Sequence, residues 1–100
     1  MSEEKRKLVT IVTEAAVESR LLRDLEMLGA KGYTLTDARG KGSRGIREAG
    51  WDTSTNIRIE IVCNAATASA ISRYLREHYY ANYGMILYTA DVEVMRGEKF

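Results

Sequence analysis

The order of the periodic segments limits the fold of this sequence more than any other feature. Strand-like runs, rich in β-branched residues or alternating apolar and polar positions, occur four times. The clearest alternates Ile57, Ile59 and Ile61 with Arg58 and Glu60. The predicted strands are residues 7–13, 33–38, 56–63 and 85–94. Helical periodicity follows the first and third of these runs, so the sequence predicts the order strand, helix, strand, strand, helix, strand.

Capping residues mark the start of each predicted helix. Thr13 is placed to cap the first helix and Glu14 suits its first turn, whereas Asn64 is placed to cap the second. Gly29 and Gly32 bracket the end of the first helix, as left-handed stop positions do. The inward residues expected are Val17, Leu21, Leu22, Leu25 and Leu28 in the first helix, and Ala68, Ile71, Leu75 and Tyr79 in the second.

This order of elements is the βαββαβ pattern of a ferredoxin-like α+β fold, a four-stranded antiparallel sheet with two helices on one face. One hundred residues give room for a single domain, residues 1–100. The first strand is apolar on both faces, with Val9 and Ile11 on one and Leu8 and Val12 on the other. Because two helices cover one face only, we expect the other face to pack against further copies of the chain.

Composition narrows the class of function. The formal net charge is +1, with acidic and basic residues interspersed, which argues against general binding of nucleic acid. The sequence has no apolar run of membrane-spanning length and no apolar leader, and its single cysteine, Cys63, has no partner for an internal disulfide. We therefore expect a cytoplasmic protein in a reducing compartment.

Residues 40–55 form a long predicted loop whose first half is suited to bind an anion. Glycines allow backbone N–H groups to converge on an anion, a serine adds a hydroxyl donor, and arginine forks match phosphate oxygens. The residues concerned are Gly40, Lys41, Gly42, Ser43, Arg44 and Arg47. The spacing of the glycines matches the Gly-x-Gly-x-x-Gly motif of dinucleotide-binding proteins, but no helix follows the segment as that motif requires. The segment does not match the P-loop motif either. From these residues alone, a phosphate site and a flexible basic loop both remain open.

Four segments resemble the PII-like signal proteins, in particular the SbtB group of that family. These segments are residues 32–34, residues 40–44 with Arg47, residues 83–88 and residues 92–97. The similarity covers nearly the whole chain, and the Gly-Lys-Gly-Ser-Arg segment is its most specific part. Several relatives carry a cysteine-containing redox loop after the last strand. This sequence has no cysteine there, so the resemblance does not carry over the thiol switching or the nucleotide hydrolysis attributed to that loop.

The resemblance implies a homotrimer that is not an enzyme and that binds adenine nucleotides in clefts between subunits. The implied ligands are cAMP, AMP, ADP and ATP, the last with a divalent metal. The residues from Gly40 to Ser43, with Arg44 and Arg47, would hold the phosphate. The backbone of Met85, Ile86 and Leu87 would face the adenine.

The resemblance also implies a partner. Members of the SbtB group regulate the bicarbonate transporter SbtA in cyanobacterial carbon concentration, so an SbtA-type transporter at the inner face of the plasma membrane is the implied partner. Residues 44–55 would be the T-loop that reaches it, with contacts from Arg44, Arg47 and Trp51. Trp51, a large aromatic in a polar loop, is either an interface anchor or folded back on its own subunit.

Other residues with reactive side chains have simpler interpretations. Cys63 fits a core position, and His78 fits a helix surface without a second metal ligand. The tyrosines at 74, 79, 80 and 83 fit helix packing.

Two functions of other classes remain as alternatives. An RNA-binding module of the same fold would need aromatic residues on its central strands. A weak nucleotide hydrolase would need a base beside a nucleophile, and no such pair stands out.

Overall fold

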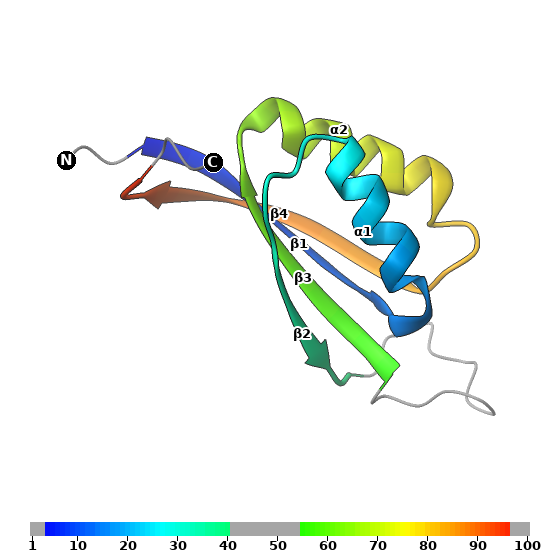
Figure 1. The fold of residues 1–100 in the computed structure, drawn as a ribbon. Coiled ribbons are helices and arrows are strands. Elements are labelled where there is room, and N and C mark those ends of the chain that lie inside the picture. Colours follow the sequence, from blue (N-terminus) through cyan, green and yellow to red (C-terminus); the bar gives the residue numbers. More distant parts are fainter. Residues whose placement is uncertain (1–3, 41–54, 97–100) are drawn as a thin grey trace.

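The computed structural model describes residues 4–40 and 55–96, which build one antiparallel sheet and two α-helices (Figure 1). The strand order is β2-β3-β1-β4, with every neighbouring pair antiparallel. The elements are β1 (Glu4–Glu14), a 3₁₀ turn η1 (Ala15–Val17), α1 (Glu18–Met27), β2 (Thr34–Ala38), β3 (Asn56–Cys63), α2 (Ala65–His78) and β4 (Met85–Val94).

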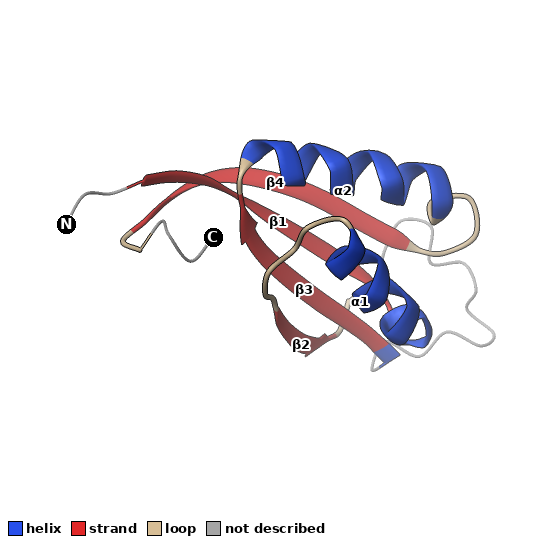
Figure 2. Ribbon diagram, turned by 45° about the horizontal axis from the view of Figure 1, so that its top comes forward, coloured by secondary structure: helices blue, strands red, loops and turns tan. Residues whose placement is uncertain are grey.

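Both helices pack on the same face of the sheet, as Figure 2 shows. The predicted ferredoxin-like α+β fold is therefore confirmed. None of the helices among residues 4–40 and 55–96 is long and apolar enough to cross a bilayer.

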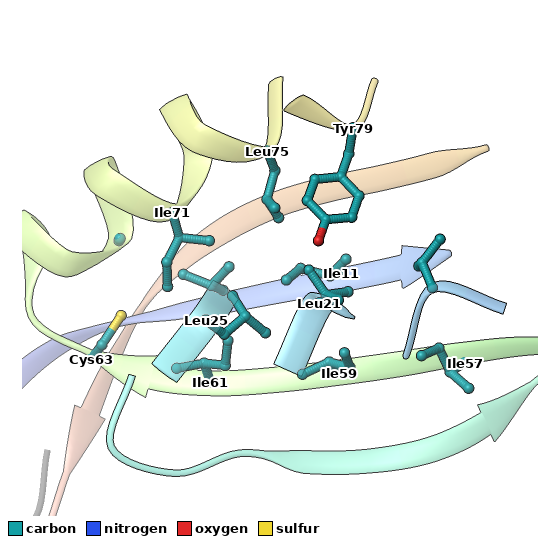
Figure 3. Close-up of a cluster of buried hydrophobic side chains, with 13 residues drawn as sticks. Ile11, Leu21, Leu25, Ile57, Ile59, Ile61, Cys63, Ile71, Leu75 and Tyr79 are labelled. Carbon is teal, nitrogen blue, oxygen red and sulfur yellow. The ribbon is translucent and has the colours of Figure 1, made fainter. Parts of the chain in front are cut away.

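Strand β1 lies in the middle of the core because it pairs with β3 on one edge and with β4 on the other. Its residues Val9 and Ile11 sit opposite Ile61 and Ile59, and all four side chains are fully buried under the helices (Figure 3). From the helices, the predicted inward residues Leu21, Leu25, Ile71, Leu75 and Tyr79 complete this layer. The alternation of β3 and the helical stripes thus predicted the core correctly.

The second face of the sheet is not covered by any described element. On this face Val12 pairs with Arg58 of β3 on one side and with Ile86 of β4 on the other. The side chains of Ile86 and Tyr88 are 54% and 50% exposed, a large fraction for apolar groups in a sheet. The face is mixed in character, because Arg58 forms an ion pair with Glu60 at 2.6 Å beside these apolar residues.

The start of the first helix differs from the prediction. Strand β1 extends to Glu14, and a 3₁₀ turn precedes α1, so Thr13 does not cap a helix. Its hydroxyl is instead directed across the sheet, where it donates to the carbonyl oxygen of Gly84. At the far end of α1, Gly29 has the left-handed φ of 108° that was expected. Gly32 does not have a positive φ, so its interpretation as a left-handed stop was wrong.

The start of the second helix follows the prediction. The Asn64 side chain accepts a hydrogen bond of 2.8 Å from the backbone N–H of Thr67, which satisfies one of the N–H groups left open at a helix start. Just before it, Cys63 is buried at the end of β3. Burial raises the pKa of the Cys63 thiol, which therefore stays protonated and unreactive at neutral pH, as expected for a core residue.

Tyr79 connects the two helices. Its ring is fully buried, and its hydroxyl donates a 2.5 Å hydrogen bond to Oδ2 of Asp24 in α1. The guanidinium of Arg20, one turn earlier, lies 4.7 Å from the centre of the same ring. Burial, and then the hydrogen bond to Asp24, raise the pKa of Tyr79 well above its ordinary value of 10.0.

We predict that Tyr79→Phe lowers the free energy of unfolding by about 1–2 kcal/mol at pH 8, because a buried hydrogen bond is lost while the ring remains. The difference should shrink above about pH 10. In the unfolded chain Tyr79 then loses its proton, whereas the folded protein resists this loss, so the wild-type advantage is present below pH 10 and disappears as pH rises. Urea unfolding of both proteins between pH 8 and 11 measures this. A difference that is constant over this range would contradict the assignment.

Candidate functional site

Gly40 is the one predicted phosphate-binding residue of the long loop that the structure describes. It follows β2, and a Cβ built on its backbone would meet no atom of the described residues within 4 Å. The remaining predicted residues of this loop lie outside the described residues. They are Lys41, Gly42, Ser43, Arg44, Arg47 and Trp51.

The structure places the base of this loop and the start of β4 at the same end of the sheet. Ala38, at the end of β2, pairs with Asn56 of β3, which pairs in turn with Glu14 of β1. Met85, the first residue of β4, pairs with Thr13. Both parts of the predicted site therefore lie at one end of the sheet.

Within one chain, however, these two parts belong to opposite edges of the sheet (Figure 1). The order β2-β3-β1-β4 places two strands between β2 and β4. Three strand spacings amount to about 14 Å. The described part of a single chain thus does not form one compact cleft from both parts, and each edge offers only half of a site.

The three predicted adenine-facing residues differ in exposure. Met85 and Leu87 are directed toward the helices and pack partly against the core, whereas Ile86 is on the uncovered face and 54% exposed. Since β4 is an edge strand of the described sheet, the backbone N–H and C=O groups along its outer edge have no strand partner within residues 4–40 and 55–96. Backbone contact with a ligand is therefore sterically available at this edge.

Two residues that the sequence analysis assigned to the helix start in fact hold the approach to β4. The Thr13 hydroxyl donates to the Gly84 carbonyl at 2.8 Å, and the Gly84 N–H donates to Oε2 of Glu14 at 2.6 Å. Gly84 is thus bound on both sides of its backbone by the end of β1. No local pattern could have indicated this, because a Thr-Glu pair before an apolar stripe is equally typical of a helix start.

Two observations on the described residues concern the alternative functions. The central strands β1 and β3 carry no aromatic side chain on which a base could stack. Residues 4–40 and 55–96 contain no cluster of three or more metal-ligating side chains, and His78 stacks on Tyr74 with ring centres 4.1 Å apart. Of the four tyrosines, Tyr79 is buried and Tyr74 and Tyr83 pack against the core, as predicted from their spacing. For Tyr80 the prediction of packing was wrong, because its side chain is 37% exposed and lies outside the core cluster.

Comparison with known proteins gives one family match. Residues 6–99 match the family model "Nitrogen regulatory protein P-II". Among solved structures, a PII-like signalling protein from Thermus thermophilus is 47% identical, with a TM-score of 0.84, and the match covers 100% of this chain and 99% of that one.

More distant structures share the fold. CPII from Thiomonas intermedia, a nitrogen regulatory PII-like protein, was solved with ADP, AMP and bicarbonate; it is 22% identical, with a TM-score of 0.83, over 99% of this chain and 96% of that one. GlnK of B. subtilis, in its ATP complex, is 17% identical, with a TM-score of 0.59, over 90% and 85% of the two chains.

The family model spans both of the regions that carry the predicted site, the loop after β2 and the start of β4, as well as both helices. The alignment with the Thermus protein, at 47% identity, covers the whole chain. This chain belongs to the PII family of signalling proteins.

Proposed function

We propose that this protein is a non-enzymatic regulator that binds adenine nucleotides between the subunits of a homotrimer and controls an SbtA-type bicarbonate transporter through residues 44–55. The observation that carries the proposal is the family match over residues 6–99, combined with a basic, glycine-rich segment that directly follows β2. The proposed ligands are cAMP, AMP, ADP and ATP, with a divalent metal accompanying ATP.

The position of the two half-sites supports binding between subunits. The phosphate-binding segment starts at the β2 edge, and the adenine-facing backbone lies on β4, about 14 Å away across the sheet. When the β4 edge of one copy meets the β2 edge of the next, the two halves form a single cleft. A closed ring of such head-to-tail contacts gives every copy one complete site.

The uncovered sheet face supports the trimer. Val12, Ile86 and Tyr88 line this face, and the last two are about half exposed in the single chain. An apolar surface of this kind on a domain of 100 residues is most readily buried against other copies of itself.

The residues from Gly40 to Arg47 supply the groups that a phosphate needs. Three of them are cationic, namely Lys41, Arg44 and Arg47, and the glycines let the backbone approach the ligand closely. The same segment continues into the residues proposed to reach the transporter. A ligand that binds its first half would therefore favour particular conformations of its second half. The adenine nucleotides and the bicarbonate bound to CPII are consistent with a role in sensing energy state and inorganic carbon.

We predict that Arg47→Ala weakens binding of cAMP by about tenfold to a hundredfold, because one charge-assisted contact to phosphate is worth about 1.5–3 kcal/mol. Calorimetry on wild type and variant measures this. Arg23→Ala is the matched control, because it removes the same charge from the exposed surface of α1. Unchanged affinity in Arg47→Ala would refute this placement of the phosphate.

A charge on the uncovered face should break the trimer. We predict that Ile86→Asp shifts the mass found by light scattering from three chains toward one, because a carboxylate buried in the interface would lack a partner. Met27→Asp is the control, since Met27 is 66% exposed on α1, on the helical side of the sheet. If both variants remain trimeric, the trimer does not use this face.

The transporter contact is tested through Trp51. We predict that Trp51→Ala reduces recovery of the protein with membranes that contain an SbtA-type transporter by at least about tenfold, as expected when an interface anchor is truncated. Affinity for cAMP should stay within about twofold of wild type. Recovery that is equal for both proteins, with every nucleotide present in turn, would exclude Trp51 as the anchor.

A further inference from the structure

An open cavity of about 310 Å³, lined mostly by exposed residues, lies between α2 and the sheet, away from the nucleotide site proposed above. Its polar lining comes from β1, α2 and β4, three segments that Figure 2 shows side by side. The polar residues are Lys7, Ser69, Ser72, Arg73, Arg76 and Thr89. The alanines at 65 and 68 complete the lining, so no acidic side chain of residues 4–40 and 55–96 lines the cavity.

Apart from Lys7, the polar side chains of the lining are hydrogen-bond donors that the described part of the fold does not use. Arg73 and Arg76 make no hydrogen bond or ion pair with any residue of the described part of the chain, and neither do the hydroxyls of Ser69, Ser72 and Thr89. Arg73 and Arg76 occupy exposed positions one helical turn apart on α2, a spacing at which like charges disfavour each other unless an anion offsets them. An oxyanion in the cavity would satisfy these groups together.

Lys7 is partly neutralised. Its ammonium donates to Oδ1 of Asp91 at 2.5 Å, just outside the cavity, and this hydrogen bond holds the pKa of Asp91 below its ordinary value. Because an ammonium has three protons, Lys7 retains donors for a second acceptor. The charge of the cavity is therefore set by Arg73 and Arg76, with Lys7 contributing hydrogen bonds.

The chemistry of this lining favours a phosphate over a carboxylate. A carboxylate offers two oxygens and one charge, whereas a phosphate monoester offers three terminal oxygens and close to two charges at neutral pH. Arginine forks bind such oxygens in pairs, and serine and threonine hydroxyls can serve the remaining lone pairs. Three hydroxyls beside two guanidinium groups match the larger number of acceptors.

We propose that this α2–β4 cavity binds the phosphate group of a small phosphorylated molecule, at a site separate from the nucleotide cleft. The separation follows from the strand register. Thr89 pairs with Val9, four residues along β4 from the pairing of Met85 with Thr13, and four residues of strand span about 13 Å. The proposal does not depend on the nucleotide site, and either could hold without the other.

The test is a titration of the full-length protein with inorganic phosphate at constant ionic strength, followed through backbone amide signals in NMR spectra. We expect saturable shifts at Ser69, Ser72 and Thr89, and weaker binding of acetate. Arg73→Gln should weaken phosphate binding at these amides by about tenfold or more. Arg23→Gln, the matched loss of one charge on α1, should change it by less than about twofold.

Three outcomes would overturn the proposal. The first is shifts that saturate only in residues 40–47, which would assign the phosphate to the nucleotide cleft. The second is an equal effect of Arg73→Gln and Arg23→Gln, which would indicate general screening of charge. The third is Arg73-dependent co-sedimentation with phosphatidic acid vesicles in the absence of any response to free phosphate, because the site would then serve a membrane surface. Loss of cAMP binding in Arg47→Ala with intact phosphate shifts would leave the proposal standing.

Discussion

Strand β1 is hydrogen-bonded along both edges, and the placement of every other element follows from this position. Its pairing with β3 brings the loop after β2 to one side of the molecule, and its pairing with β4 brings the backbone proposed to face the adenine to the other. Its alternate residues face the helices, where Val9 and Ile11 are fully buried. The strand is apolar on both faces: one face is covered by the helices, and the other is the face proposed to pack against neighbouring copies.

The sequence predicted the fold well wherever a single local pattern, such as strand alternation or a helical stripe, determined the structure. The alternation of β3 has a single explanation, a strand buried on one face, and the structure agrees residue by residue. The Asn64 cap and the burial of Tyr79 were also predicted, because a capping side chain and a helical stripe are local features. The prediction failed at Thr13 and Glu14, where the decisive partner is Gly84, 71 and 70 residues away in the chain.

The candidate site could be predicted only in part, for a related reason. The glycines and arginines after β2 indicate anion chemistry by composition, and the resemblance adds the start of β4. Neither signal shows that the two lie on opposite edges of one sheet, which is a property of strand order. The α2–β4 cavity was missed altogether. Its donors come from three separate elements, and in the sequence Ser69, Arg73 and Arg76 are typical of a solvated helix face.

The segment that connects α2 to β4 is held by hydrogen bonds at both of its ends. Tyr79, bound to Asp24, holds it where the helix finishes, and the backbone of Gly84 is bound by Thr13 and Glu14 where the strand starts. The short segment between Tyr79 and Gly84 is therefore restricted, and it loses little conformational entropy when a ligand binds. A ligand that docks on the first residues of β4 therefore meets a surface that is already shaped, and little of its binding energy is spent on ordering the chain there.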